Sequence, residues 1–244
     1  MKQGVYTLTH SRELARDVRE LQLSGDTSPL TAPGQFVNIR LDGCFLRRPI
    51  SVCCWQPGSL TLIVKAAGRG TQALVQLKPG AQLDLLCGLG NGFDLTCRPA
   101  RPLLLGGGLG AAPLYGLARA LLAQGSAPAV VLGFGSRADV FYEREFRALG
   151  VPVQIATLDG SAGVRGTALD ALPKNAPYDL FYACGPQPML KAACQTLPTP
   201  GFVSLEERMG CGFGACMGCS CQTTAGSKRV CKEGPVFAKE ALVW

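Results

Sequence analysis

The spacing of hydrophobic and polar residues changes twice along the chain, and each change predicts a new structural region. In residues 1–97 the apolar residues come in short runs, and Val37, Ile39 and Leu41 alternate with polar neighbours. A period of two is typical of a strand with one buried face. Residues 59–67 predict another strand, and Pro-Gly pairs that favour turns separate such runs. Many short strands joined by turns predict an antiparallel β-barrel.

Residues 98–200 alternate strand-like apolar runs with helical patterns. One predicted helix carries Leu114, Leu117 and Leu121 on a single face and ends at Gly125. Strands are expected at 103–105, 129–134, 152–157 and 179–183, and further helices at 142–149 and 188–194. Repeated strand–helix units predict a parallel sheet with helices on its faces.

Residues 201–244 are rich in glycine and cysteine and too few to form a core of their own. We expect a metal, together with packing on the rest of the chain, to organise them. The predicted fold class is therefore a multidomain protein, α+β and α/β. Residues 1–97 form an antiparallel barrel domain, 98–200 a parallel α/β nucleotide-binding domain and 201–244 a small metal-binding subdomain.

Charge and hydropathy exclude several classes of protein. The net charge is +7, but the basic residues are scattered and form no run of five, which argues against a nucleic-acid surface. A solvated basic face and a docking face for an acidic partner both remain open. The most apolar stretch, 103–122, contains Pro113 and Arg119 and predicts strand, turn and helix rather than a membrane span. With no secretory signal at the start, we expect a cytoplasmic protein.

The chain has twelve cysteines. Seven are dispersed in apolar or strand-like surroundings, where a free cysteine usually acts as a small buried hydrophobe. These are Cys44, Cys53, Cys54, Cys87, Cys97, Cys184 and Cys194. The other five crowd into residues 211–231, and in a reducing cytosol such a cluster indicates a metal site.

Four of the crowded cysteines have the spacing of a plant-type [2Fe–2S] ferredoxin, C-x4-C-x2-C followed by a fourth cysteine. They are Cys211, Cys216, Cys219 and Cys231. Glycines at 210, 212, 214 and 218 allow the backbone to wrap closely around a cluster. Cys221 falls outside the spacing and is expected not to be a ligand. A zinc site is disfavoured because it would use paired C-x2-C units, and only one is present.

Two short motifs in the barrel region suit a flavin. Arg48 and Ser51, on a predicted strand, can reach phosphate oxygens and polar ring atoms, and a guanidinium suits phosphate. The run Gly68-Arg-Gly70-Thr71 opens a predicted helix, where backbone N–H groups bind phosphate. Neither motif is specific alone, because an exposed strand arginine would show the same pattern.

The α/β region has a glycine-rich turn between a strand and a helix, as dinucleotide-binding sites do. Its glycines are Gly106, Gly107, Gly108 and Gly110, and Pro113 follows them in the helix. A later strand ends in Cys184-Gly185, which predicts the same crevice or, alternatively, a buried cysteine and a tight turn. Arg137 suits a 2′-phosphate and Asp139 a ribose hydroxyl, or both face solvent. The choice between NAD and NADP stays open on these residues.

The order of these motifs resembles the ferredoxin–NADP reductase superfamily over nearly the full chain. Within it, the chain is similar to the electron-transfer subunits of B-type, NAD-dependent dihydroorotate dehydrogenases. The narrower resemblance rests on RRPISV, GRGT, LGNGF, GGGLGAAP, LDGSAGVRG, YACGPQPML, SLEERMGCGFGACMGCSC and CKEGPVF.

The resemblance implies FAD in the barrel, a [2Fe–2S] cluster on the four cysteines, and NAD as co-substrate in the α/β domain. The implied flavin residues are Arg48, Pro49, Ile50, Ser51, Ile63, Val64, Lys65, Gly70 and Thr71. The wider superfamily has Tyr where Ile50 stands, so no aromatic ring stacks on the flavin there.

The function that the resemblance implies is an electron relay in pyrimidine (UMP) biosynthesis. A separate FMN-containing subunit oxidises dihydroorotate, and electrons pass through the cluster and FAD to NAD⁺. That subunit is the expected partner, in a heterotetramer with two copies of each chain, and the cluster loop is expected to face it. No catalytic base is expected in this chain, because its sole histidine, His10, lies away from every motif.

Two other functions fit parts of the pattern. One is a flavin and iron–sulfur subunit that serves a hydrogenase, a sulfite reductase or a ferredoxin-dependent transhydrogenase. The other is a non-catalytic module stabilised by zinc, which would be colourless when purified.

Overall fold

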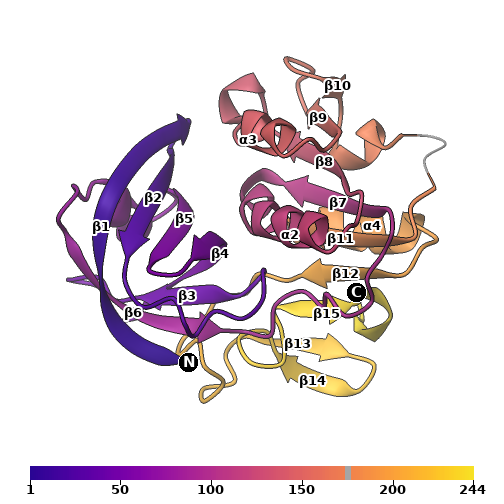
Figure 1. Ribbon diagram of the computed structural model, residues 1–244. Coiled ribbons are helices and arrows are strands. Elements are labelled where there is room, and N and C mark those ends of the chain that lie inside the picture. The colour runs from indigo at the N-terminus through magenta and orange to yellow at the C-terminus, as the bar shows by residue number, and fades with distance from the viewer. Residues whose placement is uncertain (174–176) are drawn as a thin grey trace.

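The computed structural model describes residues 1–173 and 177–244. A β-barrel at the N-terminus and an α/β sheet lie side by side, and the C-terminal segment lies along both (Figure 1). The described residues contain no helix long and apolar enough to cross a membrane.

The barrel is closed by six antiparallel strands in the order β1-β2-β5-β4-β3-β6. They are β1 (Lys2–Ala15), β2 (Val18–Ser24), β3 (Phe36–Ile39), β4 (Arg48–Gln56), β5 (Ser59–Lys65) and β6 (Gln82–Leu89). Val37 and Ile39 of β3 are buried in the barrel core, as the alternation predicted, but Asn38 between them is also 0% exposed, so β3 is buried on both faces. A short helix, α1 (Arg69–Val75), follows β5. The predicted antiparallel barrel is confirmed.

The second sheet has seven strands in the order β10-β9-β8-β7-β11-β12-β15. They are β7 (Pro102–Gly107), β8 (Ala129–Phe134), β9 (Val153–Thr157), β10 (Val164–Arg165), β11 (Leu180–Cys184), β12 (Gly201–Ser204) and β15 (Val236–Ala238). All neighbours are parallel except β12 and β15. Its central strands read as continuous apolar runs because both faces are covered.

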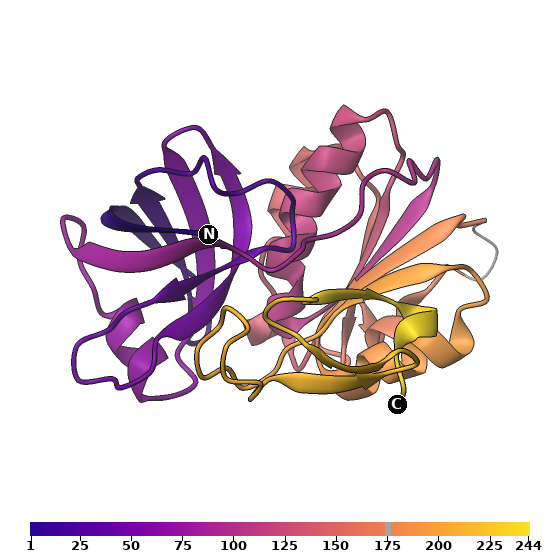
Figure 2. The ribbon, with the colours of Figure 1, turned by 90° about the horizontal axis from the view of Figure 1, so that it is seen from below.

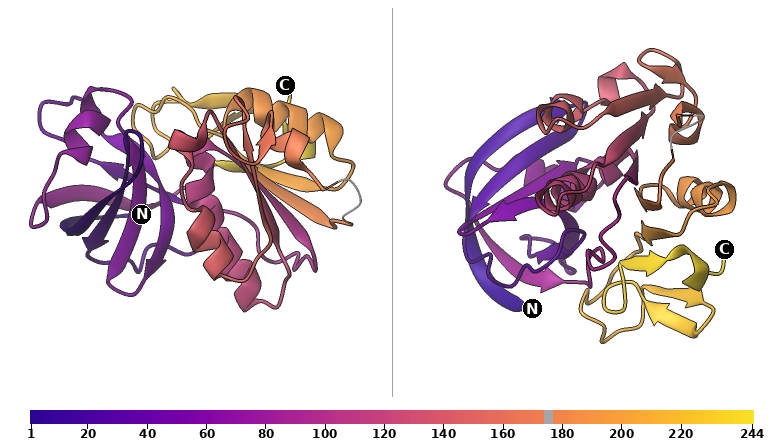
Figure 3. Two further views of the ribbon diagram at one scale, coloured as in Figure 1. Left: turned by 90° about the horizontal axis from the view of Figure 1, so that it is seen from above. Right: turned by 45° about the vertical axis from the view of Figure 1, so that its right-hand side comes forward.

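Helices cover the two faces of this sheet. Between the sheet and the barrel lie α2 (Ala111–Ala123) and α3 (Glu143–Ala148), whereas α4 (Gln187–Thr196) packs on the opposite face (Figure 3). The barrel and α2 meet at backbone contact, since a Cβ on Gly116 would lie 2.4 Å from the carbonyl oxygen of Cys53. Short 3-10 turns are η1 (Gly108–Gly110), η2 (Arg137–Asp139), η3 (Ala168–Ala171) and η4 (Lys239–Ala241).

The C-terminal segment contacts both larger parts (Figure 2). It adds the edge strand β15 to the sheet and carries a hairpin of β13 (Ser220–Thr223) and β14 (Gly226–Arg229). On the barrel side, Asn91 Nδ2 donates to the carbonyl oxygens of Glu233 and Val236, at 3.0 and 2.9 Å. Packing on the barrel and the second sheet stabilises this segment, which is too small to form its own core.

The dispersed cysteines differ in burial. Cys53, Cys87 and Cys184 are buried, and Cys44, Cys54 and Cys194 are half-buried. The expectation of a buried residue is wrong for Cys97, which is exposed because it lies in a surface turn, with its Sγ atom 3.4 Å from the hydroxyl of Tyr182.

Candidate functional site

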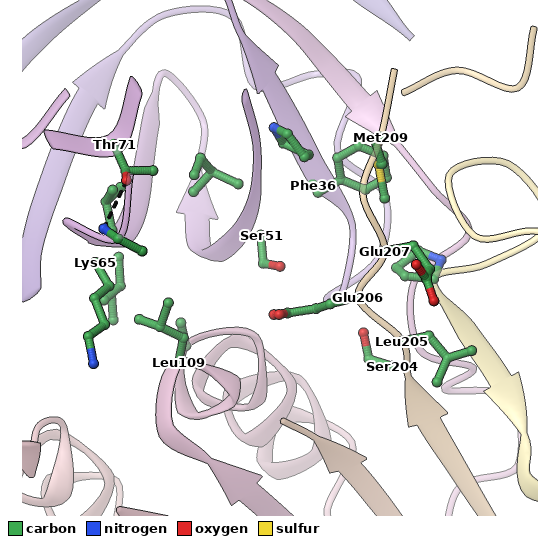
Figure 4. A pocket seen from close by; sticks show the side chains of 17 residues that line it. Phe36, Ser51, Lys65, Thr71, Leu109, Ser204, Leu205, Glu206, Glu207 and Met209 are labelled. Atoms are coloured by element: carbon green, nitrogen blue, oxygen red, sulfur yellow. Dashed lines mark hydrogen bonds between the residues drawn. The ribbon is translucent and has the colours of Figure 1, made fainter. Parts of the chain in front are cut away.

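An open cleft of about 250 Å³ lies between the barrel, α2 and the segment that follows β12 (Figure 4). Seven of the nine residues predicted to bind a flavin line it: Pro49, Ile50, Ser51, Ile63, Val64, Lys65 and Thr71. Neighbouring antiparallel strands bring the two segments together, because β4 pairs directly with β5.

The other two predicted flavin residues meet at one end of the cleft. A Cβ on Gly70 would lie 2.5 Å from Nε of Arg48, so the guanidinium lies against the first turn of α1. The Thr71 hydroxyl accepts hydrogen bonds from the N–H groups of Ala67 and Gly68, both at 3.0 Å, and thereby holds the turn. The arrangement places the Arg48 guanidinium beside the N-terminal turn of a helix, and a guanidinium suits phosphate.

Glu206, for which no sequence motif predicted a role, also lines the cleft. Its side chain points into the cleft beneath Ser51 (Figure 4). The residue is exposed at the mouth of the cleft, yet the walls remove water from its carboxyl group, and this desolvation raises its pKa. The acidic pair Glu206-Glu207, one residue past the strand Gly201–Ser204, was the available sequence signal, but only the fold brings it to the barrel.

The predicted nicotinamide motifs lie at the carboxyl ends of two adjacent parallel strands. In their pairing, Gly106 of β7 lies opposite Cys184 of β11. A Cβ on Gly110 would lie 2.0 Å from the Cys184 carbonyl oxygen, and one on Gly185 would lie 2.9 Å from Gly107 Cα. Ligands bind at this edge of open α/β sheets.

Beside these turns is an apolar cavity of about 250 Å³. Its walls include Gly107, Gly108, Phe134, Pro186 and Met189. The Cys184 thiol is buried next to it, and desolvation raises its pKa, which favours the neutral thiol over the nucleophilic thiolate.

The side chains of Arg137 and Asp139 bond to nearby loop residues. The Asp139 carboxylate accepts hydrogen bonds from the backbone N–H and the hydroxyl of Ser136, at 3.0 and 2.8 Å. Arg137 donates from Nε to the carbonyl oxygen of Ser161 at 3.1 Å. Both side chains are thus held by protein partners.

The four predicted cluster ligands lie as two pairs. The backbone N–H of Cys211 points at the Sγ atom of Cys216, and the N–H of Cys231 at the Sγ atom of Cys219, both at 3.4 Å. Cys219 and Cys231 are each 2% exposed, whereas Cys216 is exposed. Within the described residues, no three His, Cys, Asp or Glu side chains are already close enough to hold a single ion.

The chemistry of this loop nevertheless fits an iron–sulfur cluster. Burial disfavours the Cys211 thiolate, but N–H groups of Phe213, Cys216 and Ala215 outweigh it and lower the pKa of Cys211 to about 6. Gly212 and Gly214 have φ of +78° and +95°, which glycine adopts without strain. A backbone that wraps around thiolates and directs N–H groups at sulfur is what such a cluster requires.

Arg229 braces the same loop. Its guanidinium donates to the Gly214 carbonyl oxygen and pairs with the Glu233 carboxylate, where Nε lies 3.0 Å from Oε2. Cys221 lies on β13, outside both cysteine pairs, and His10 is exposed on β1.

The family described as the iron–sulfur cluster binding domain of dihydroorotate dehydrogenase B matches residues 206–243. A curated relative, the electron transfer subunit of dihydroorotate dehydrogenase B (NAD(+)) from Bacillus caldolyticus, is 44% identical over 97% of each chain. The protein of the same name from Fusobacterium nucleatum subsp. nucleatum is 38% identical over 95% of each chain.

Solved structures show the same architecture. In the NADH-dependent reduced ferredoxin-NADP oxidoreductase structure, a matching chain is 31% identical with a TM-score of 0.90, covering 99% of this chain and 90% of the other. Phthalate dioxygenase reductase, at 18% identity and a TM-score of 0.68, shares the fold over 91% of this chain and 87% of its own.

Proposed function

The chain belongs to the family of electron transfer subunits of dihydroorotate dehydrogenase B, and we propose that it delivers electrons taken from dihydroorotate to NAD⁺ in pyrimidine biosynthesis. The observation that carries this proposal is 44% identity to such a subunit over 97% of both chains. Its cofactors are FAD and a [2Fe–2S] cluster, with NAD as co-substrate. When bound, FAD exchanges electrons singly or as a hydride, whereas the cluster exchanges them one at a time.

We propose that the cleft between β4, β5 and α1 binds FAD. Arg48 and the first turn of α1 hold the pyrophosphate, supported by their contact at Gly70. Pro49, Ile50 and residues 63–65 hold the ring system, with Ile50 giving an aliphatic contact. Ser51 and Glu206 supply a hydroxyl and a carboxyl group on the cleft wall where the ring would gain or lose a proton.

We assign the nicotinamide end of NAD to the turns at the carboxyl ends of β7 and β11. Gly107, Gly108 and Gly110 allow close approach of the dinucleotide to the backbone, and Gly185 shapes the opposite wall. Leu109 lines the flavin cleft and follows Gly108, which lines the nucleotide cavity, so the two sites are neighbours. Close neighbours are needed for direct hydride transfer.

The two cysteine pairs suit a cluster with two irons, because each iron takes two thiolates from the protein. We propose that Cys211 and Cys216 bind one iron and Cys219 and Cys231 the other. The first pair lies toward solvent and the second in the apolar core beside β12. Arg229 holds the loop between Cys211 and Cys216 through the carbonyl oxygen of Gly214.

The partner that we propose is the FMN-containing subunit that oxidises dihydroorotate, in a heterotetramer of two copies of each chain in the cytoplasm. It would dock on the cluster loop, where Phe213 and Met217 are 43% and 53% exposed. Exposed large apolar side chains are typical of the centre of an interface. Charge reversal of the exposed Arg208 or Lys232, on either side of the loop, should weaken the complex.

The test is dihydroorotate-dependent reduction of NAD⁺ by the complex that co-purifies with this chain from its native cell under anaerobic conditions. Activity that follows the tagged chain supports the substrate, the nicotinamide and the partner together. A complex with flavin and [2Fe–2S] absorbance but without this activity would contradict the proposal. It would favour a partner such as a hydrogenase, sulfite reductase or transhydrogenase, the last being consistent with the 31% identity to a ferredoxin-NADP oxidoreductase.

A further inference from the structure

A fully buried asparagine lies between the flavin cleft and the cluster loop. Asn38, on β3, is 0% exposed. Its neighbours Val37 and Ile39 point into the barrel core, so Asn38 and Phe36 share the outer face of the strand. On the adjacent strand, Pro49 of the flavin motif lies opposite Asn38.

The Asn38 side chain contacts a predicted cluster ligand. Its Nδ2 atom donates a hydrogen bond to the carbonyl oxygen of Cys211 at 3.1 Å, across 173 residues of sequence. The next residue, Gly212, has φ of +78°, and a Cβ there would lie 2.4 Å from Nδ2. The backbone of the cluster loop therefore packs directly on this amide group.

This contact is not explained by packing alone. Asn38 Oδ1 is buried and accepts no hydrogen bond from the part of the chain that the structure describes. A buried polar atom without a partner destabilises the fold, and an aliphatic side chain would fill the space without that cost. What an aliphatic residue lacks is the donor that holds the Cys211 carbonyl.

The same face of β3 spans both redox sites. Phe36 lines the flavin cleft and packs in the same apolar cluster as Cys219 and Cys231. Met209, two residues before Cys211, also lines the cleft. The hydrogen bond from Asn38 thus joins the strand beside the flavin motif to the backbone of a cluster ligand.

We propose that Asn38 is a positioning residue for electron transfer between the flavin and the iron–sulfur cluster, an inference that rests on the proposed function. By donating a hydrogen bond to the Cys211 carbonyl, it fixes the distance between the flavin cleft and the cluster loop. The same bond gives electrons a hydrogen-bonded path between the two sites. Hydrogen bonds next to metal ligands also tune the reduction potential of the metal site.

The test uses the full-length chain loaded with FAD and cluster, with NADH as the reductant and rapid mixing under anaerobic conditions. In Asn38→Leu we expect wild-type iron and flavin content and an unchanged rate of flavin reduction. Subsequent reduction of the cluster should slow by about 10-fold or more. The EPR spectrum of the reduced cluster, or its midpoint potential, should also shift.

Asn91→Leu is the matched control, because Asn91 also ties the barrel side to the C-terminal segment but touches no predicted ligand. It should leave the flavin-to-cluster rate and the EPR spectrum unchanged. An unchanged rate and spectrum in Asn38→Leu, or equal slowing in Asn91→Leu, would overturn the proposal. If Asn38→Leu fails to retain iron, the rate and the EPR spectrum are compared with wild type in Asn38→Ser, whose side chain is smaller and lacks the amide. A wild-type chain whose flavin NADH does not reduce would instead contradict the proposed function.

Discussion

Arg48 lies across the first turn of α1 at Gly70, where a Cβ would come within 2.5 Å of Arg48 Nε. The two motifs, neither of which is specific on its own in the sequence, thereby form one site. Any side chain at position 70 must displace the guanidinium, whereas Gly68, two residues earlier, has open space around its Cβ position.

Gly70→Ala should therefore weaken FAD binding by about 10- to 100-fold, the loss expected for a charge-assisted contact. Titration of the apoprotein with FAD measures the effect. Gly68→Ala is the matched control, because Gly68 has an extended backbone that any residue adopts. Equal affinity in the two variants would show that Arg48 does not hold the phosphate.

Cys216→Ser should lose the cluster, and Cys221→Ser should keep it. Cys216 pairs with Cys211 through an N–H···S contact, whereas Cys221 lies on β13 and forms no part of either pair. Iron content and the EPR signal of the reduced protein distinguish the variants. Equal iron loss in both would refute the ligand assignment.

Glu206→Gln should raise the reduction potential of the bound flavin, and the difference from wild type should grow with pH. Desolvation raises the pKa of Glu206, so its carboxyl keeps its proton above the usual range and loses it as pH rises further. Once ionised, its negative charge opposes the arrival of electrons, and glutamine never acquires that charge. Redox titrations between about pH 5 and about pH 8 test this. A difference independent of pH would exclude the ionisation.

Tyr142→Phe should lower the free energy of unfolding by about 1–3 kcal/mol. The Tyr142 hydroxyl donates to Oε2 of Glu20 at 2.6 Å, and Glu20 is 5% exposed, so the variant leaves a buried carboxylate with one donor fewer. Urea denaturation measures the change. Tyr115→Phe is the control, since its ring packs edge-on against Tyr142 and keeps that contact. A larger effect at Tyr115 would contradict the account.

Phe213→Asp should weaken the complex by about 2 kcal/mol, roughly 30-fold in Kd, if this aromatic side chain is buried at the partner interface. Val164→Asp is the control because Val164 is exposed to a similar degree, 39% against 43%, on the far edge of the second sheet. Co-purification and surface binding measure both. Identical affinity for the two variants would move the interface away from the cluster loop.

Local patterns in the sequence predicted the antiparallel barrel, the parallel sheet and the cluster segment. Period-two alternation, strand–helix units and the spacing from Cys211 to Cys219 are each patterns of nearby residues, so they can be recognised without knowledge of the fold. The exposure of Cys97 was not predictable in this way, because it depends on where a turn meets the surface.

Contacts between distant segments were decided only by the tertiary structure. The position of Glu206 in the flavin cleft beside barrel strands and the bond from Asn38 to Cys211 join residues more than 130 positions apart in sequence. Neither residue type signals such a role, since an exposed glutamate and a strand asparagine are common. The sequence by itself determined which cofactor motifs each segment carries. The packing of barrel, sheet and C-terminal segment determined which other residues lie at the flavin cleft and the cluster loop. Burial and hydrogen bonding depend on neighbours that only the closed fold supplies.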